Sequence, residues 1–150
     1  MKHKGSAFEY KDDRDADLLE AYKRELASNS IISLAEIARR ISQSPAKRFW
    51  VSEERALIVI SEMERGIKLK ITTKNKRDMF LELHRRYTLY KEEHPDMTMQ
   101  EIVFRICNEP APRWYLSPGS ILVILYRARK EAKKRCYEER KRRLRFMFSL

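Results

Sequence analysis

The sequence predicts an all-α protein that contains two copies of a three-helix unit and ends in a long basic helix. Three observations lead to this prediction. Apolar residues recur at spacings of three and four in several segments, which is the periodicity of helices with one buried face. Only three glycines occur among 150 residues, and no two segments alternate as paired strands would. One stretch of sequence also appears twice, as in proteins built from repeats.

The repeated stretch is Ser44–Ser52, and its second copy, Glu109–Ser117, follows 65 residues later. Both copies read Pro-Ala-x-Arg, then two aromatic residues, an aliphatic residue and Ser. Nine of the 27 aligned pairs between residues 34–60 and 99–125 are identical, so we predict a tandem duplication. Because a unit of this size is marginally stable alone, we expect the copies to share or abut one core. The pairs predicted to be buried alike are Ile37 and Ile102, Ile41 and Ile106, Leu57 and Leu122, and Ile60 and Leu125.

The first repeat is predicted over residues 15–67, after a mobile leader of residues 1–14. Its first helix begins at Asp15 and carries an apolar stripe at helical spacing. Its second helix is capped by Ser33, and Glu36 lies three residues later, as in a capping box.

A third helix completes this repeat. Pro45 ends the second helix because its ring disfavours helical angles in the residue before it. Ser52 caps the third helix. Its middle, residues 56–60, is apolar on every side, which predicts a fully buried helix. We expect this helix to end at Gly66.

The second repeat is predicted over residues 79–128, after a basic linker of residues 68–78. Thr98 and Ser117 are expected to cap its second and third helices, as their counterparts do in the first repeat. No glycine ends the third helix. We therefore predict that it continues into a basic C-terminal helical extension of residues 129–150.

Catalytic motifs do not stand out in the sequence. The three histidines are scattered, the two cysteines lack metal-ligand spacing, and there is no glycine-rich phosphate loop. We therefore expect no enzyme, cofactor, metal or small-molecule substrate. Cys107 and Cys136 fit reduced intracellular thiols better than a disulfide framework, although a pairing stays open. No apolar run could span a membrane or form a signal peptide, so we expect a cytoplasmic location.

The charge of the chain indicates a polyanionic partner. Lys and Arg outnumber Asp and Glu by 33 to 22, and the isoelectric point is near 9.8. Residues 127–145 hold 11 Lys or Arg against three Glu, a net charge of +8 distributed on every side of the predicted helix. Such a segment is either a solvated helix or a binding arm. The apolar residues at its end are expected to fold back onto the core or to dock on another chain, which would join copies into a homo-oligomer; anchoring in a membrane interface is the less favoured alternative. These residues are Leu144, Phe146, Met147, Phe148 and Leu150.

The repeated loop allows two interpretations. In the first, its aromatic residues wedge between helices and its arginines, Arg48 and Arg113, cap carbonyl oxygens or stack on aromatic rings. In the second, the loop is a contact surface whose arginines bind phosphate. Aromatic side chains mostly serve cores, which favours the structural interpretation for the aromatics. For Arg48 and Arg113 both interpretations stay open.

The segment Ser33–Ile41, with its Glu-Ile-Ala core, resembles the first helix of helix-turn-helix DNA-binding domains, and residues 99–103 form a weaker copy. The resemblance implies that the helix after Ser52 or Ser117 is the recognition helix. The connection between the helices is longer than the usual tight turn. Two glutamates would face DNA after Ser52, whereas the Ser-Pro-Gly-Ser opening at residues 117–120 is neutral. The helix after Ser117, in the second copy, is therefore the better candidate for the recognition helix.

These observations predict nucleic-acid binding, with double-stranded DNA favoured. The alternative is a protein-interaction or assembly module, such as an accessory protein of a phage or mobile element, in which the repeated Pro-Ala-x-Arg loops contact protein. The residues predicted to bind nucleic acid are Arg39, Arg40, Lys47, Arg48, Arg113, Ser117, Ser120, Arg127, Lys130, Lys133, Lys134, Arg140, Lys141, Arg142 and Arg143.

Overall fold

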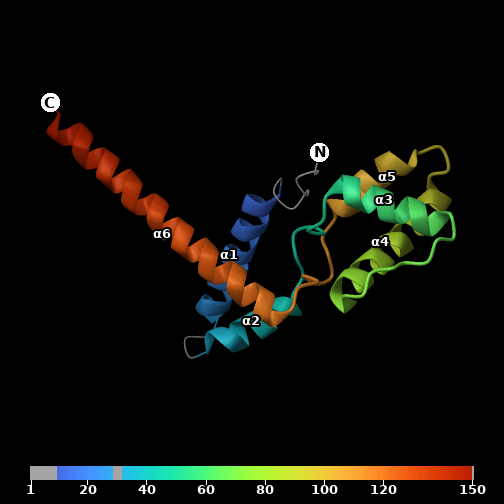
Figure 1. Cartoon of the computed structure of the whole chain (residues 1–150), viewed down its shortest axis with the longest axis horizontal. Coiled ribbons are helices and arrows are strands. Elements are labelled where there is room, and N and C mark those ends of the chain that lie inside the picture. The colour runs from blue at the N-terminus through green and yellow to red at the C-terminus, as the bar shows by residue number, and fades with distance from the viewer. Residues whose placement is uncertain (1–9, 29–31, 150) are drawn as a thin grey trace.

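The computed structural model describes residues 10–28 and 32–149, which form six helices and no β-strand (Figure 1). The predicted all-α fold class and the long last helix are confirmed. The helices are α1 (Lys11–Ser28), α2 (Leu34–Ser42), α3 (Glu53–Glu64), α4 (Lys74–Glu93), α5 (Met99–Cys107) and α6 (Pro118–Phe148).

Four helices begin at the caps that the sequence predicts. In each, the cap side chain accepts a hydrogen bond from the backbone N–H three residues later. The capping box is complete only at Thr98, where the Glu101 carboxylate accepts a hydrogen bond from the cap backbone. Glu36 instead accepts hydrogen bonds from two arginines of its own helix, so this half of the predicted box is absent from α2. The four caps are Ser33, Ser52, Thr98 and Ser117.

Two helices begin earlier than predicted. α1 begins at Lys11, so residues 11–14 belong to a helix, whereas residues 1–9 of the predicted leader lie outside the described residues. Two aspartates in its first turn favour this start because they lie at the positive end of the helix dipole. α4 begins at Lys74, inside the predicted linker of residues 68–78. The apolar periodicity missed both starts because it begins about one turn later.

The helices pack in two lobes that differ from the two sequence repeats (Figure 1). The first lobe consists of α1, α2 and α6, and the second lobe consists of α3, α4 and α5. The third helix of each repeat therefore completes the other repeat. The predicted repeats, residues 15–67 and 79–128, are thus not separate packing units, because each leaves an apolar face that only the other repeat covers. That the two halves arose by duplication stays a prediction.

The third helices cross to the other repeat at the point where two connecting loops lie against each other. These loops are residues 43–52 and 108–117. Ala46 and Ala111 form an antiparallel bridge, and each backbone N–H donates to the other residue's carbonyl oxygen at 3.1 Å. These two alanines are the Ala of the repeated Pro-Ala-x-Arg sequence. The repeated stretch therefore pairs with its own copy between the lobes.

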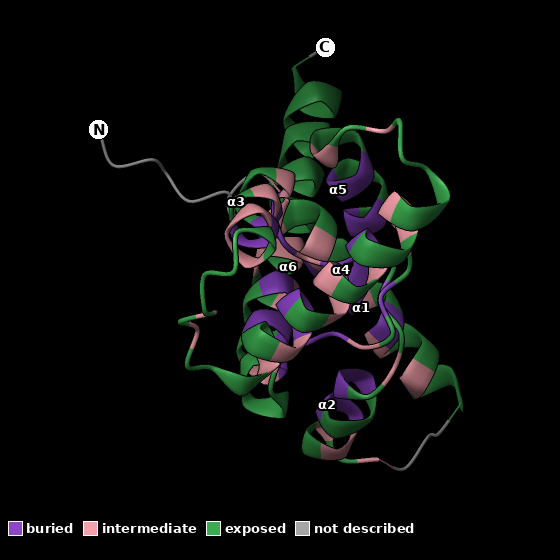
Figure 2. Ribbon diagram, turned by 90° about the vertical axis from the view of Figure 1, so that its right-hand side faces the viewer, coloured by how far each residue is buried: buried purple, intermediate pink, exposed green. Residues whose placement is uncertain are grey.

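The core confirms most of the predicted buried pairs (Figure 2). The third helix of the first repeat was predicted to be fully buried around residues 56–60, and this is wrong; the matching helix of the second repeat is also partly exposed. Ile58 is 45% exposed and Val123 is 64% exposed, while Leu57 and Leu122 are only partly buried. Each third helix packs mainly against two other helices, so one of its sides faces solvent. The confirmed buried pairs are Ile37 and Ile102, Ile41 and Ile106, and Ile60 and Leu125.

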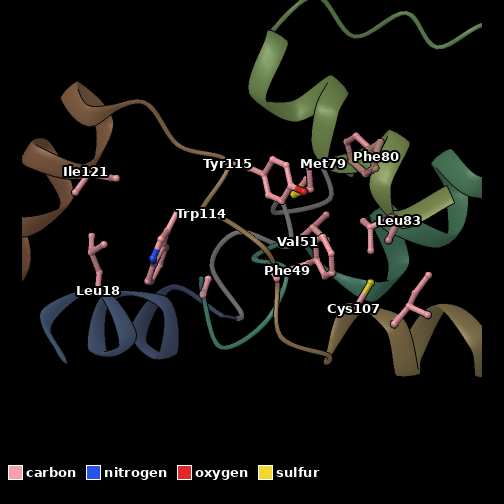
Figure 3. Packing of buried hydrophobic residues seen from close by; sticks show 14 of the residues in the cluster. Leu18, Phe49, Val51, Met79, Phe80, Leu83, Cys107, Trp114, Tyr115 and Ile121 are labelled. Atoms are coloured by element: carbon pink, nitrogen blue, oxygen red, sulfur yellow. The ribbon is translucent and has the colours of Figure 1, made fainter. Parts of the chain in front are cut away.

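The second loop directs Trp114 toward α1 and Tyr115 toward Met79 of α4 (Figure 3). In the first loop, the Trp50 side chain donates to Asp17 of α1. Phe49 of the first loop stacks with Tyr115 of the second loop, with ring centroids 6.0 Å apart. Trp50 and Trp114 stack in the same way at 6.5 Å, and Trp114 lies near Leu18 of α1 (Figure 3). The burial of Phe49, Trp114 and Tyr115 favours the structural interpretation of the aromatics, and the two stacked pairs also join the loops.

The two cysteines are free and lie in different environments. Cys107 is buried in α5, and burial raises the pKa of its thiol to about 12. Cys136 is exposed on α6. The expectation of reduced thiols agrees with this arrangement.

Candidate nucleic-acid interface

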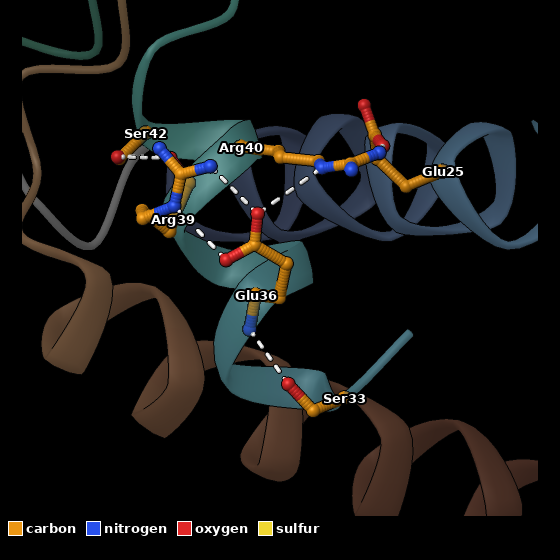
Figure 4. Close-up of polar contacts among 6 residues, drawn as sticks. All are labelled: Glu25, Ser33, Glu36, Arg39, Arg40 and Ser42. Carbon is orange, nitrogen blue, oxygen red and sulfur yellow. Dashed lines mark hydrogen bonds and ion pairs between the residues drawn. The ribbon is translucent and has the colours of Figure 1, made fainter. Parts of the chain in front are cut away.

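The two predicted arginines of α2 are bound within the protein (Figure 4). Arg39 donates two hydrogen bonds to the Glu36 carboxylate, at 2.6 and 3.0 Å. Arg40 donates to the same carboxylate at 3.3 Å and lies 3.9 Å from the Glu25 carboxylate. The hydrogen bonds from Arg39 lower the pKa of Glu36 to about 2. Both cations are therefore already paired with anions of the fold.

Arg48 is held by backbone carbonyl oxygens. Its guanidinium donates to the carbonyls of Phe49 at 3.0 Å and Val51 at 2.9 Å, and to the Asn108 side chain at 3.1 Å. It also lies over the ring of Trp50, 5.4 Å from the centroid. These contacts tie the first loop to the end of α5, which favours the structural interpretation of Arg48.

Arg113 and Lys47 are likewise paired. Arg113 donates to the Asp78 carboxylate at 2.9 Å and lies over the Tyr115 ring, 4.5 Å from the centroid. Lys47 forms an ion pair with Glu20 of α1. The predicted loop cations are thus directed at acidic groups and rings of the protein. That these cations contact phosphate stays a prediction.

We expect the separate changes Arg48→Ala and Arg113→Ala to lower the free energy of unfolding by about 1–3 kcal/mol, because each leaves buried or partly buried acceptors without a charged donor. The affinity of the folded variants for DNA should stay close to that of the parent. Denaturant titration and DNA titration below the melting temperature measure the two effects. Arg39→Ala is the control, since the Arg39 side chain is 61% exposed. An unchanged stability together with weaker DNA binding would support the phosphate interpretation instead.

The remaining predicted cations lie on α6, whose second half projects away from the lobes (Figure 1). Its buried residues end at Ala128, and every residue from 133 to 149 is exposed. At about 1.5 Å per residue, the exposed part extends for about 25 Å. Its described apolar end residues, Leu144, Phe146, Met147 and Phe148, are exposed and do not fold back onto the core, whereas Leu150 lies outside the described residues.

Unpaired positive charge is concentrated on this projecting helix. Residues 10–126 hold 20 Lys or Arg and 18 Asp or Glu, a net charge of +2, against +8 for residues 127–149. Within the described residues, the cations from Lys130 to Arg145 form no ion pair with a carboxylate of the protein. A solvated helix with this charge density attracts polyanions.

Some of these cations share a face with exposed aromatic residues. The residues of this outward face are spaced three or four apart, as neighbours on one helix face are. None of the three glutamates of residues 127–149 occupies these positions. The face points away from the buried residues of α6, such as Ile124 and Ala128. It comprises Tyr126, Lys130, Lys133, Tyr137, Lys141, Leu144 and Phe148, with Lys134 and Arg140 beside it.

The predicted residues at the start of α6 line a groove between α6 and α1. Ser117 caps the helix and donates to the Ser120 hydroxyl at 2.9 Å. The groove continues to Arg127 and is lined on the α1 side by Lys11 and Arg14. Lys11 and Arg14 were not among the predicted site residues, because they fall in the predicted leader. Tyr126 and Tyr137 were not predicted either, although the three-and-four spacing along the outward face could have indicated them.

The resemblance to helix-turn-helix domains implied that α3 or α6, the helix after Ser52 or Ser117, is the recognition helix. In the structure, α2 packs against α6, and α5 packs against α3. α2 and α5, the helices that carry the motif, therefore each pack against the third helix of the other repeat. The recognition role of α6 stays a prediction.

Other site chemistry is limited in the parts of the chain that the structure describes. No group of three or more His, Cys, Asp or Glu residues there could hold a metal ion. His84 and Glu64 form an isolated pair at 2.8 Å on the surface of the second lobe. None of the helices in the described ranges is long and apolar enough to cross a membrane.

Comparisons of the chain with protein-family models, curated proteins and solved structures found no match. The functional inference therefore rests on the geometry and charge of α6.

Proposed function

We propose that the protein binds nucleic acid in the cytoplasm, with double-stranded DNA as the preferred form, through the outward face of α6. One observation carries the proposal. The predicted cations of α2 and the loops are bound by acidic groups, carbonyl oxygens and rings of the protein, whereas those of the projecting helix have no carboxylate partner within the described residues. Phosphate oxygens would supply the missing partners and release counterions on binding.

The shape of α6 supports a duplex as the partner. The major groove of DNA admits an α-helix. Residues 133–149 are exposed on all sides, so this part of the helix can approach a duplex without a clash with the lobes. The lysines of the outward face, Lys130, Lys133 and Lys141, span about 16 Å along the helix. They would contact several phosphates, while Arg127 lies where the helix leaves the first lobe and Ser120 lies in the first turn of α6.

The second candidate function is a protein-interaction or assembly module. It is favoured by exposed apolar side chains that a DNA interface does not need, above all Phe104 of α5 and Phe146 and Met147 of α6. Contiguous exposed apolar groups commonly mark protein interfaces. This candidate does not exclude DNA binding, because the two sets of side chains lie on different surfaces.

A direct titration tests the DNA proposal. The full chain is titrated into a labelled random-sequence duplex and into a single strand of the same length, and binding is followed by fluorescence anisotropy. We expect saturable duplex binding with a dissociation constant of about 1–100 µM or tighter at physiological salt, as for non-specific DNA binders. The single strand should bind more weakly. Equal binding of both would contradict the preference for duplex, and no binding of either would favour the assembly module.

A further inference from the structure

The tip of α6 has an apolar surface that neither the fold nor the proposed DNA interface uses. Phe146 and Met147 are 72% and 68% exposed, and they line a hollow together with Arg142 and Arg143. Residues four apart share a face of a helix, so these four side chains form one surface, the tip face. Its pattern is two adjacent cations followed, one turn later, by two adjacent apolar residues.

A groove on the second lobe has the complementary pattern. Glu53 and Glu54 open α3, and the apolar Leu57 and Ile58 follow one turn later. Across the groove, Phe104 of α5 is 59% exposed. The α3–α5 groove is lined by Glu53, Glu54, Leu57, Gln100, Val103 and Phe104.

We propose that the tip face of one copy of the chain docks in the α3–α5 groove of a second copy. When the two helices lie parallel, Arg142 and Arg143 meet the glutamates at the start of α3. One turn further, Phe146 and Met147 meet the apolar side chains of the groove. Arginine–carboxylate pairs supply direction and charge-assisted hydrogen bonds, and burial of the exposed apolar groups supplies the driving force. Aromatic residues, Met and Arg are also the residue types enriched in protein interfaces.

Glu54 is the principal acceptor for the arginines of the tip face. Glu53 is already engaged, because its carboxylate accepts a hydrogen bond from Asn108 at 3.3 Å and lies 3.5 Å from the Arg48 guanidinium. Glu54 is exposed and forms no ion pair with any described residue. Its charge is therefore free for a partner.

The tip face belongs to a second copy rather than to the same molecule. α6 is one continuous helix, and its tip points away from α3 and α5 (Figure 1). A chain cannot bring its tip to its own groove without breaking this helix. Side-by-side pairing of two α6 helices is opposed by their like charges. Because tip and groove are different surfaces, the contact is heterologous, and repetition adds further copies in open chains.

Sedimentation velocity of the full chain over a range of concentrations, without DNA, tests the proposal. The mean mass of the wild type should rise with concentration. Glu54→Lys should weaken association at least tenfold, because it places a cation opposite the arginines of the tip face. Arg142→Glu combined with Arg143→Glu should do the same from the other surface. Circular dichroism verifies that each variant is folded.

Mixing the two variants provides a sharper test. Each variant lacks one of the two surfaces, yet the intact tip face of the Glu54→Lys protein can dock in the intact groove of the other protein. The mixture should therefore associate although neither variant does so alone. Glu93→Lys at the end of α4 and Lys133→Glu combined with Lys134→Glu on α6 are the charge-matched controls, and both should associate like the wild type.

Three results would overturn the proposal. The first is a wild type that stays monomeric up to about 1 mM. The second is an equal loss of association in Glu54→Lys and Glu93→Lys, which would indicate a net-charge effect. The third is a mixture that stays monomeric while the wild type associates, since another surface would then join the copies.

Discussion

Phe49→Ala is expected to lower the free energy of unfolding by about 3–5 kcal/mol, the usual cost of truncating a buried Phe. Phe49 is completely buried. Its ring stacks on Tyr115, and the Arg86 guanidinium lies 4.8 Å from the ring centroid. Its backbone N–H also donates to the Cys107 carbonyl at 3.1 Å. The side chain thus belongs to the first repeat but fills the core of the second lobe.

The position of Phe49 predicts which helices the Phe49→Ala change should destabilise first. A cavity between the first loop and α5 would loosen α4 and α5, which come from the other repeat, before it affects α1 and α2. Hydrogen exchange should therefore rise most in Met99–Cys107 at mild denaturant concentration, while denaturant titration measures the total loss.

Phe104→Ala is the matched control for Phe49→Ala. It makes the same chemical change at an exposed position of α5, where substitutions usually cost within about 0.5 kcal/mol. If Phe49→Ala were as mild as this control, the first loop would not fill the second lobe. The exchange of third helices would then need another explanation.

Local signals in the sequence predicted the helices well. Ser33, Ser52, Thr98 and Ser117 cap the helices that they were expected to cap, because a cap depends on the residue itself and on the backbone three residues away. Gly66 adopts a positive φ of 76° just after α3, as expected at a helix end. These features need no knowledge of distant contacts.

The partners of the helices could not be predicted in the same way. The repeat made Ala46 and Ala111 visible as equivalent residues, but equivalence does not indicate that the two alanines bond to each other. The apolar middle of α3 suits α4 and α5 as well as it suits α1 and α2. Whether α3 packs on its own repeat or on the other one depends on how the two loops cross. Such long-range choices are therefore settled by packing rather than by local pattern.

For a related reason, the sequence predicted which residues are the candidate cations but not which of them are already bound within the protein. Sequence reveals that a residue is a cation but not which acceptor it reaches. Arg48 and Lys133 look alike in this respect, yet Arg48 donates to carbonyl oxygens of its own loop whereas Lys133 is exposed on the projecting helix. The density of charge in residues 127–145 did indicate the part of the chain on which unpaired cations are found.

Replacing Lys130, Lys133, Lys134 and Lys141 together by Gln is expected to weaken duplex DNA binding by on the order of a thousandfold at about 0.1 M salt. Each phosphate contact contributes about −0.9 to the slope of log affinity against log salt concentration, so four lost contacts should make the slope shallower by about 3–4 units. Glutamine is nearly as good a helix former as lysine, and these four side chains are exposed. The helix and the fold should therefore persist.

The matched control is the replacement of four lysines around the linker and the start of α4, Lys68, Lys70, Lys74 and Lys76, by Gln. This control removes the same charge from exposed positions of the second lobe. Anisotropy titrations at several salt concentrations should leave its slope within about one unit of the wild type, because lysines outside the interface release no counterions on binding. Equal slopes for the two quadruple variants would mean that net charge, and not the outward face of α6, governs binding. If the α6 variant kept the salt slope of the wild type, α6 would not be the phosphate-binding element, and the assembly function would be favoured.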